Sequence, residues 1–354
     1  MRLPVMPPVE PMLAKLVSEL PSGQFYEPKW DGFRAIVFRD GDEVVIGSRN
    51  GRPLARYFPE LVEAALRNLP RRCVVDGEIV IAGRFWALQQ RLHPAASRVR
   101  RLAGETPAVF CAFDLLALAE SDYTPRPFHE RRAALEGALA AAAPPIHLTP
   151  ITRDERQARA WFDELAGTDG LIAKDGEQPY RPGERVMRKF KHHKTADCVV
   201  AGYRVHASDP QLVGSLLLGL YDDGTAPVRW ADAFGGLVPI GVVGSFSKAR
   251  RRELLAELAP LVVDAADHPW ARAEPEAVGG PGSRWSPGKS LSFVPLRPER
   301  VLEIRYGQVD GRRLRYPGQF VRWRPDREPD SCTYEQLEQP VSFDLAEVLG
   351  LPDR

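Results

Sequence analysis

The apolar residues of this chain recur with two spacings, one typical of strands and one typical of helices. Short apolar runs at 35–38 and 43–46 flank an Asp-Gly pair, and we predict that they form a β-hairpin. Apolar runs at 73–81, interrupted by Asp76-Gly77-Glu78, and at 109–116 predict buried strands. Between positions 58 and 69 the apolar residues follow a helical spacing, which predicts an amphipathic helix.

Further helices are expected in the same part of the chain. The first 25 residues carry prolines at positions 4, 7, 8 and 11, so we expect an irregular lead-in followed by a short helix at 12–20. An alanine-rich helix is expected to end at Ala143, and another to occupy 157–165. Together with the strands, these helices indicate the α+β class, with antiparallel sheets flanked by helices.

Beyond residue 195 the pattern changes to short strands separated by glycine turns. The strands are expected at 199–205, 216–221, 228–234, 242–246, 301–306 and 312–323. A helix at 248–263 and a loop rich in glycine and proline at 264–287 interrupt them. Because one helix inserted into a small barrel is typical of an OB-fold, we expect a first domain at 1–194, an OB-fold at 195–327 and a C-terminal extension at 328–354.

Composition narrows the class of protein. A chain of 354 residues with 44% hydrophobic residues is long enough for two domains with separate cores. Lys and Arg number 48 against 47 Asp and Glu, so the net charge of +1 neither implies nor excludes a nucleic-acid partner. The four cysteines lack the spacing of a zinc site or disulfide framework, which fits a reduced cytoplasm. We see no signal peptide and no membrane span.

The hexapeptide KWDGFR at 29–34 carries the strongest chemical signal. A lysine beside an acid, a glycine and an arginine suggests a site where Lys29 attacks phosphorus and carries a nucleotide as a phosphoramidate. Because the attacking amine must be neutral, we expect burial and neighbouring cations to lower the pKa of Lys29. The alternative is a surface hairpin, since Asp-Gly is a turn signal and lysine usually faces solvent. The hexapeptide alone leaves both interpretations open.

Charged residues inside apolar strands are the next candidates. Glu78 follows Asp76 and Gly77 in a strand that is otherwise apolar, and buried charge costs free energy unless it has partners. The alternative is a strand end or a bulge at Gly77. Phe113 lies in a second buried strand, where packing in the core is the usual fate of an aromatic residue.

The remaining candidates are cations and one acid. Lys189 and Lys191 share one face of a strand and repel unless an anion binds them, although an exposed basic strand edge has the same pattern. Arg49 follows a strand in a turn, where most arginines are simply solvated. Asp169 offers a carboxylate of the kind that magnesium prefers.

These motifs together resemble one superfamily. KxDGxR at 29–34 is the pattern of covalent nucleotidyltransferases, which include ATP-dependent DNA ligases, RNA ligases and mRNA capping enzymes. The segments SRNG at 48–51, DGE at 76–78, FDLL at 113–116, DGLIAK at 169–174, RKFK at 188–191 and RPDR at 324–327 are similar to the later motifs, in the same order. Asp169 stands where that pattern has glutamate, and Arg327 where it has lysine. The whole chain resembles the stand-alone LigC group of actinobacterial ATP-dependent DNA ligases.

The resemblance implies a role for each candidate residue. Lys29 is expected to form lysyl-AMP with ATP, and Asp169 and Glu78 to bind Mg²⁺ or Mn²⁺. Nucleotide contacts are expected from Glu27, Arg34, Arg49, Glu78, Phe113, Arg185, Lys189, Lys191, Arg324, Asp326 and Arg327. Within this set, Phe113 is expected to stack on adenine, Glu78 to bond the ribose hydroxyls, and the last motif to orient pyrophosphate. The first domain is then the adenylation domain.

The function that follows is ATP-dependent sealing of nicks in duplex DNA, in DNA repair, by a cytoplasmic monomer. Its partners are ATP, nicked double-stranded DNA, and a repair polymerase or end-binding proteins. An RNA ligase or capping enzyme shares the hexapeptide but not the FDLL and SRNG context. A binding protein without catalysis is the second alternative, and a labelled ATP adduct separates the two. An NAD-dependent ligase is disfavoured because its zinc module needs a different cysteine spacing.

Overall fold

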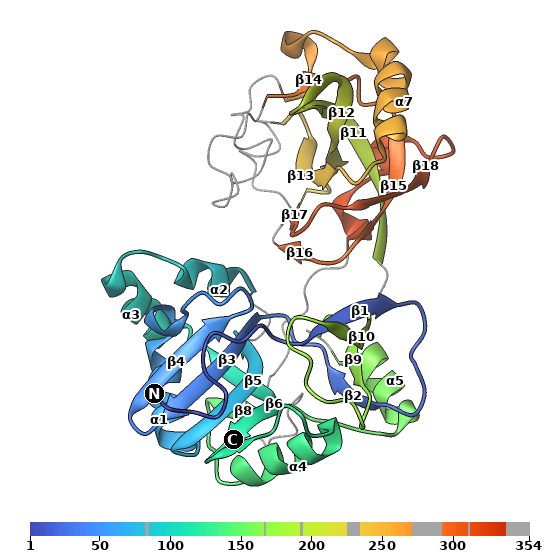
Figure 1. The fold of residues 1–354 in the computed structure, drawn as a ribbon. Coiled ribbons are helices and arrows are strands. Elements are labelled where there is room, and N and C mark those ends of the chain that lie inside the picture. The colour runs from blue at the N-terminus through green and yellow to red at the C-terminus, as the bar shows by residue number, and fades with distance from the viewer. Residues whose placement is uncertain are drawn as a thin grey trace. The chain divides into compact units, whose positions relative to one another are not determined.

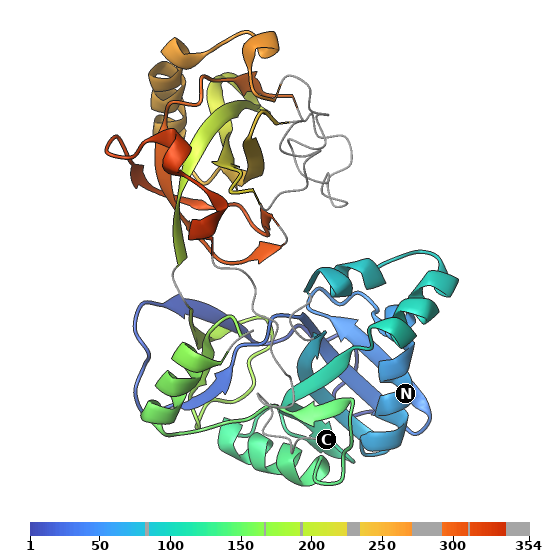
Figure 2. The same cartoon turned by 180° about the vertical axis from the view of Figure 1, so that it is seen from behind.

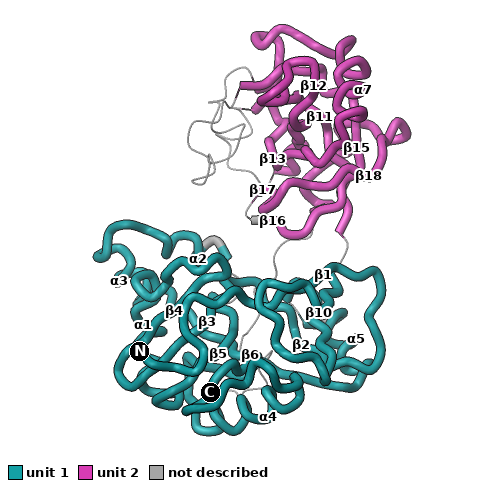
Figure 3. Tube along the Cα trace, in the orientation of Figure 1, with its two compact units in different colours: residues 1–192, 341–354 teal, residues 193–340 magenta. Residues whose placement is uncertain are grey.

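The structure is a computed structural model that describes residues 1–81, 85–165, 168–191, 194–224, 234–270, 292–310 and 312–337 (Figure 1). It has two compact units, built from residues 1–192 and 193–340 (Figure 3). The expected strand at 228–234 apart from Phe234, most of the 264–287 loop, and the chain after residue 337 lie outside the described residues. No helix within the described ranges is long and apolar enough to cross a membrane.

The larger sheet of the first unit has six strands in the order β4-β3-β5-β6-β7, with β8 beside β6. They are β3 (Phe33–Asp40), β4 (Glu43–Ser48), β5 (Arg72–Val80), β6 (Val109–Leu118), β7 (Ser121–Asp122) and β8 (Ile146–Leu148). The hairpin and both buried strands expected from the sequence are confirmed. The β6–β8 pair is parallel, so the expectation of purely antiparallel sheets is wrong here.

Both faces of this sheet are covered, which explains why its strands are mostly apolar rather than alternating between apolar and polar residues. In β3, Ala35 and Val37 face one core, and Ile36 and Phe38 face another. Helices cover the first face (Figure 2). They are α1 (Pro59–Asn68), α2 (Phe85–Arg91) and α4 (Phe128–Ala138), while α3 (Ala96–Glu105) packs on α1 and α2. Helix α1 confirms the helix expected at 58–69, whereas α4 ends at Ala138 rather than at Ala143.

The smaller sheet of this unit has the strand order β1-β10-β9-β2. Its strands are β1 (Leu13–Val17), β2 (Phe25–Pro28), β9 (Leu171–Lys174) and β10 (Arg185–Phe190). Helix α5 (Glu155–Glu164) packs against it through Ala158, close to the expected bounds. Met12 and Met187 join Ile36 and Phe38 in one core, so the two sheets of the unit pack against each other.

The helix expected at 12–20 is wrong, because residues 13–17 form strand β1. This strand pairs in parallel with β10, and the pair satisfies backbone groups that a helix would have satisfied internally. The second parallel pair in the unit again departs from the antiparallel expectation. Since the partner strand lies far along the chain, tertiary pairing overrides the local helical pattern.

The second unit is built on a six-stranded sheet with the order β13-β12-β11-β15-β18 and with β14 beside β11. The strands are β11 (Lys194–His206), β12 (Asp209–Tyr221), β13 (Leu237–Val243), β14 (Val294–Pro295), β15 (Val301–Tyr306) and β18 (Gln319–Trp323), with a separate hairpin of β16 (Val309–Asp310) and β17 (Arg313–Leu314). Gly318 N–H donates to the Val242 carbonyl at 2.8 Å, so the two ends of the sheet meet and close a barrel. Helix α7 (Lys248–Leu258) packs on β12, which completes the expected OB-fold.

Several bounds in this unit differ from expectation. Strands β11 and β12 begin at Lys194 and Asp209, earlier than the expected 199 and 216. The strand expected at 242–246 is β13, which begins at Leu237 and has a bulge at Ile240, where its register against β12 shifts. The strand expected at 312–323 is divided into β17 and β18. Helix α7 stops at Leu258, and a 3₁₀ turn that contains Pro260 follows it. The 3₁₀ turns of the chain are η1 (Ala55–Tyr57), η2 (Ala259–Leu261), η3 (Ala265–Asp267), η4 (Pro329–Ser331) and η5 (Tyr334–Gln336).

Candidate active site

A pocket of about 190 Å³ lies in the first unit, lined by residues from both of its sheets. The candidate residues that line it are Glu27, Lys29, Arg34, Arg49, Glu78, Phe113, Arg185 and Lys189. The packing of the two sheets therefore brings together residues that are up to 162 positions apart in the sequence, from 27 to 189.

Lys29 lies directly after β2, and its backbone is fixed on both sides. Lys29 N–H donates to the Gly170 carbonyl at 2.8 Å, and Asp169 N–H donates to the Lys29 carbonyl at 2.9 Å. Gly170 has φ +119°, and a Cβ there would lie 2.1 Å from the Phe190 carbonyl oxygen. Only glycine fits this position. The nucleophile candidate and Asp169 are thus held side by side by the backbone.

Gly32 brings the segment after Lys29 against β5. A Cβ on Gly32 would lie 2.1 Å from the Ile79 carbonyl oxygen, a distance that real side chains do not reach. Residues 29–34 connect β2 of the smaller sheet to β3 of the larger sheet. The alternative of a surface hairpin is therefore wrong, because the two flanking strands do not pair with each other.

Lys29 forms an ion pair with Asp169, with 2.7 Å between Nζ and Oδ2, and Lys191 forms an ion pair with the same oxygen. Burial alone would lower the pKa of Lys29, but the charge of Asp169 outweighs it and the pKa is raised. The expected lowering of the Lys29 pKa is wrong, because the charge of Asp169 and its hydrogen bond to Lys29 outweigh the effect of burial. The two lysines hold the pKa of Asp169 below its usual value despite burial.

Glu78 also lines the pocket. Its backbone lies opposite that of Arg34 in the β3–β5 ladder, so its position on the larger sheet is fixed. Burial raises the pKa of Glu78 to about 7, and the nearby charges of Arg34 and Lys29 offset this only in part. The carboxylate is therefore short of positive charge or hydrogen-bond donors, which a bound ligand can supply.

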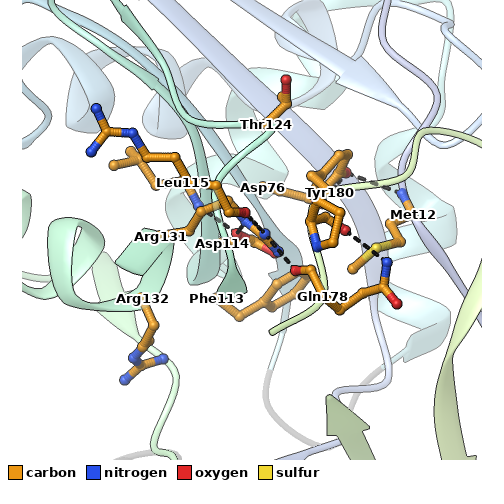
Figure 4. Close-up of polar contacts among 12 residues, drawn as sticks. Met12, Asp76, Phe113, Asp114, Leu115, Thr124, Arg131, Arg132, Gln178 and Tyr180 are labelled. Carbon is orange, nitrogen blue, oxygen red and sulfur yellow. Dashed lines mark hydrogen bonds and ion pairs between the residues drawn. The ribbon is translucent and has the colours of Figure 1, made fainter. Parts of the chain in front are cut away.

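Arg34 is held inside the protein by a network of polar contacts that includes Asp76, Tyr180 and Met12, and Figure 4 labels these three partners. Its guanidinium makes two 2.6 Å hydrogen bonds to Asp76, and the Tyr180 hydroxyl donates to the same carboxylate at 2.6 Å. Met12 N–H donates to the Tyr180 oxygen at 3.1 Å. The Arg34 guanidinium also lies 4.3 Å from the centre of the Phe113 ring. Asp76 and Tyr180 were not identified as site residues, although a charge inside an apolar strand already required a partner for Asp76.

Glu27 is almost fully buried beside Lys174, which lies on β9 and was not among the candidates. Lys174 Nζ lies 2.7 Å from Glu27 Oε2 and donates to the Phe113 carbonyl at 3.2 Å. Burial raises the pKa of Glu27 and lowers the pKa of Lys174, in each case against the charge of the partner. Lys174 is the last residue of the motif at 169–174. Its place in that motif is the sequence signal that could have identified it as a site residue.

Three cations complete the pocket. Arg49, Arg185 and Lys189 line it, and within the described residues no ion pair joins any of them to a carboxylate. Burial lowers the pKa of Lys189, and the charges of Lys191 and Lys29 lower it further. This clustering of positive charge fits the expected contacts with phosphate oxygens.

Arg324, Asp326 and Arg327 belong to the second unit, where they gather around Asp197 of β11. Arg324 Nη1 lies 2.8 and 2.9 Å from the two oxygens of Asp197, and its Nη2 lies 2.8 Å from Asp326. Arg327 Nε lies 3.8 Å from Asp197. The roles of these three residues toward the nucleotide stay predictions.

The residues of the pocket fit a divalent cation that shares its ligands with a substrate. Within the described part of the chain, no three acidic, histidine or cysteine residues are grouped to hold a metal ion. The carboxylate oxygens of Glu78, which lines the pocket, and of Asp169, which contacts Lys29, are hard ligands. Magnesium commonly binds one or two carboxylates together with phosphate oxygens and water, so two acids are sufficient.

Comparison with known proteins decides the family. A family model described as ATP dependent DNA ligase domain matches residues 10–191, and a model described as ATP dependent DNA ligase C terminal region matches residues 209–327. The chain belongs to the ATP-dependent DNA ligases. This ligase is an enzyme that seals nicks in duplex DNA, and ATP is its nucleotide substrate.

Relatives confirm the resemblance of the ligase to the LigC group. DNA ligase C2 of Mycolicibacterium smegmatis is 59% identical over 353 residues, which cover 96% of this chain and 97% of that protein. DNA ligase C of Mycobacterium tuberculosis is 56% identical over 366 residues, which cover 99% of both. A solved structure of a Lig E DNA ligase, 18% identical, covers 88% of this chain and 98% of that chain with a TM-score of 0.55, which supports the fold alone.

Proposed function

We propose that Lys29 is the nucleophile of this ligase and carries AMP from ATP to the nick. The observation that carries this proposal is the position of Lys29 Nζ. It lies in the pocket, in contact with Asp169 and among the cations Arg49, Arg185 and Lys189. A lysine buried among phosphate-binding groups is suited to attack a phosphorus atom.

In the first step, the ammonium of Lys29 passes a proton to solvent, and the resulting amine attacks the α-phosphorus of ATP and gives a second proton to solvent as the phosphoramidate forms. A P–N bond forms, the bond to the bridging oxygen of the β-phosphate breaks, and pyrophosphate leaves. Arg49, Arg185, Lys189 and Lys191 stabilise the negative charge of the phosphates. Such fixed charges, together with alignment of the reacting atoms, supply most of the acceleration in this class of reaction.

In the second step, a 5′-phosphate oxygen of the nick attacks the phosphorus of lysyl-AMP. The P–N bond breaks, and the amine of Lys29 takes up a proton. In the third step, the 3′-hydroxyl attacks the 5′-phosphorus, AMP leaves, and the hydroxyl proton passes to solvent. Lys29 has no covalent part in the third step, and this difference allows a direct test.

Adenosine recognition is assigned to Glu27, Glu78 and Phe113. Glu27 lines the pocket, and its Oε1 is buried and accepts no hydrogen bond from the described residues, so it suits the exocyclic amino group of adenine. Glu78 suits the ribose hydroxyls, and Phe113 offers an aromatic face to the base. Guanine places a carbonyl oxygen where adenine has the amino group, so the same acceptor favours ATP over GTP.

Asp169 and Glu78 would hold Mg²⁺ or Mn²⁺, for which their oxygens are suitable ligands. When bound, the ion supplies positive charge to the phosphates. Without the ion, Asp169 still fixes Lys29 and Lys191, and Glu78 still lies opposite Arg34. These contacts orient the nucleophile before the nucleotide enters.

We assign residues 1–194 to the adenylation domain, 195–327 to the OB-fold and 328–354 to a C-terminal extension. Arg324, Asp326 and Arg327 of the OB-fold are proposed to orient pyrophosphate during the first step. Asp197 holds Arg324 through both carboxylate oxygens, so this guanidinium is already fixed in one orientation. The OB-fold also suits contact with the nick, and binding through phosphates weakens as salt rises.

We further propose that the ligase acts in DNA repair, as a monomer in the cytoplasm. A nick with adjacent 3′-hydroxyl and 5′-phosphate ends is what a gap-filling polymerase leaves, so a repair polymerase or end-binding protein is the expected partner. All four cysteines are free and buried, which is compatible with a reducing compartment. Sensitivity of a deletion strain to DNA damage tests the repair role.

The proposal is tested with two DNA substrates and one variant. Lys29→Ala is expected to lose sealing of a 5′-phosphate nick with ATP but to seal a nick that already carries 5′-linked AMP. Lys15→Ala, at an exposed lysine of β1, is the matched control and is expected to seal both. Sealing of the 5′-phosphate nick by Lys29→Ala would show that Lys29 is not the nucleophile.

A further inference from the structure

Lys174 is a buried cation that the proposed mechanism does not use. Its side chain is 3% exposed, at the end of β9. Its Nζ lies 2.7 Å from Glu27 Oε2, 3.2 Å from the Phe113 carbonyl oxygen, and 4.7 and 4.5 Å from the ring centres of Phe113 and Phe128. Since an isolated buried ammonium is costly, these contacts fix its position rather than leave it mobile.

The contacts of Glu27 divide its carboxylate into two unlike oxygens. Oε2 is bound by Lys174, whereas Oε1 accepts no hydrogen bond although it is buried. The cation that lies closest to Oε1 in an ion pair is Arg132, with its Nη1 at 3.8 Å. Arg132 is itself held in place, because Nε donates to Glu136 at 2.7 Å and Nη2 donates to the Thr149 carbonyl at 2.8 Å. One buried acceptor of this pocket-lining residue is therefore left without a donor among the described residues.

We propose that Lys174 sets the selectivity for adenine by fixing Glu27 so that Oε1 remains an acceptor for an exocyclic amino group. This inference deepens the proposed function and rests on the assignment of Glu27 to the base. Lys174 acts through Glu27, so it is a positioning residue and not a catalytic one.

The charge of Lys174 matters as well as its position. Burial raises the pKa of Glu27, and Lys174 is the largest opposing influence. Without that charge the carboxyl is more readily protonated, and it then carries an O–H donor. Such a donor pairs with the 6-carbonyl oxygen of hypoxanthine or guanine. Loss of Lys174 thus removes the preference for the 6-amino group as well as the orientation of the acceptor.

The test compares ATP with ITP, which differ at the 6-position of the base by an amino group and a carbonyl oxygen. The rate of lysyl-nucleotide formation is measured by intact mass over a range of each nucleotide, which gives kcat/KM for both. Lys174→Met, which removes the charge at similar length, is expected to lower the ATP-to-ITP ratio by about tenfold or more, on the order of one lost buried hydrogen bond. Lys174→Gln is expected to act in the same direction.

Glu27→Gln separates failure of this inference from failure of the assignment on which it rests. If Glu27→Gln changes the ratio and the folded Lys174 variants do not, the inference about Lys174 is wrong and the role of Glu27 stands. If Glu27→Gln leaves the ratio unchanged, the assignment of Glu27 to the base is wrong, and the inference fails with it. Equal loss of activity with both nucleotides, or loss of fold in both Lys174 variants, would show a structural role and would overturn the proposal.

Discussion

Asp169 holds the amine of Lys29 by an ion pair of 2.7 Å in the ligase without nucleotide. The same carboxylate binds Lys191, so one acid lies between two cations that the proposed mechanism uses for different tasks. The pKa of Lys29 is raised, so Asp169 holds the amine of the proposed nucleophile in its protonated form. The proposed attack on phosphorus therefore requires Lys29 to lose a proton that Asp169 stabilises.

The close approach of Gly32 to β5 gives a sharp mutational test. Gly32→Ala is expected to abolish or strongly reduce lysyl-AMP formation, because the new Cβ would lie 2.1 Å from the Ile79 backbone oxygen and must displace the segment that carries Lys29. Gly104→Ala is the matched control, since no atom lies within 4 Å of a Cβ there and Gly104 is helical. Gly104→Ala is expected to be active and at least as stable as the native protein. A fully active Gly32→Ala would contradict the close approach.

The hydroxyl of Tyr180 is expected to contribute to stability. Tyr180→Phe removes the donor to Asp76 and the acceptor for Met12 N–H, and it leaves both groups buried without that partner. We expect the free energy of unfolding to fall by about 1–3 kcal/mol, measured by urea denaturation. Tyr316→Phe, at a tyrosine that is 59% exposed, is expected to change it by less than about 0.5 kcal/mol. Equal effects of the two variants would contradict the network.

Because its thiols are buried, the protein is expected to have a lower free energy of unfolding at alkaline pH. Burial raises the pKa of Cys73 to about 12, with Arg39 opposing it, whereas an unfolded thiol ionises near pH ~8.5. Between these values the unfolded state binds fewer protons, so stability falls as pH rises, by about 1.4 kcal/mol per pH unit for each such thiol. Urea denaturation at pH 8.5 and 9.5 measures this slope. Cys73→Ala is expected to show a shallower slope, and an unchanged slope would contradict the assignment.

The sequence predicted most elements and site residues whose signals are local. Lys29, Arg34, Glu78 and Phe113 lie where motif spacing and strand pattern indicated, and they line one pocket. Strand β1 was missed because its backbone partners lie on β10, far along the chain, and no local pattern encodes a parallel pairing. Strand β13 was misplaced because Pro239 interrupts its pattern; in the structure Pro239 lies opposite Gly219, and the next residue, Ile240, is left unpaired in a bulge.

Polar and charged pairs between residues far apart in the sequence were the part of the site that the sequence predicted least well. Asp76 and Tyr180 are 104 positions apart, and Glu27 and Lys174 are separated even further. The sequence showed that buried charges need partners but not which partners they have. The same limit explains the wrong expectation for the pKa of Lys29. The acid that raises this pKa is Asp169, which lies far from Lys29 in the sequence.

Intact mass spectrometry after incubation with ATP and magnesium tests the central claim most directly, provided that any pre-bound AMP is first removed with pyrophosphate. We expect one added AMP on the native protein, located on Lys29 by peptide mapping, and none on a folded Lys29→Ala variant. An adduct on another residue would contradict the assignment of Lys29. No adduct on the folded native protein would contradict the covalent mechanism itself and would favour a protein that only binds nucleic acid.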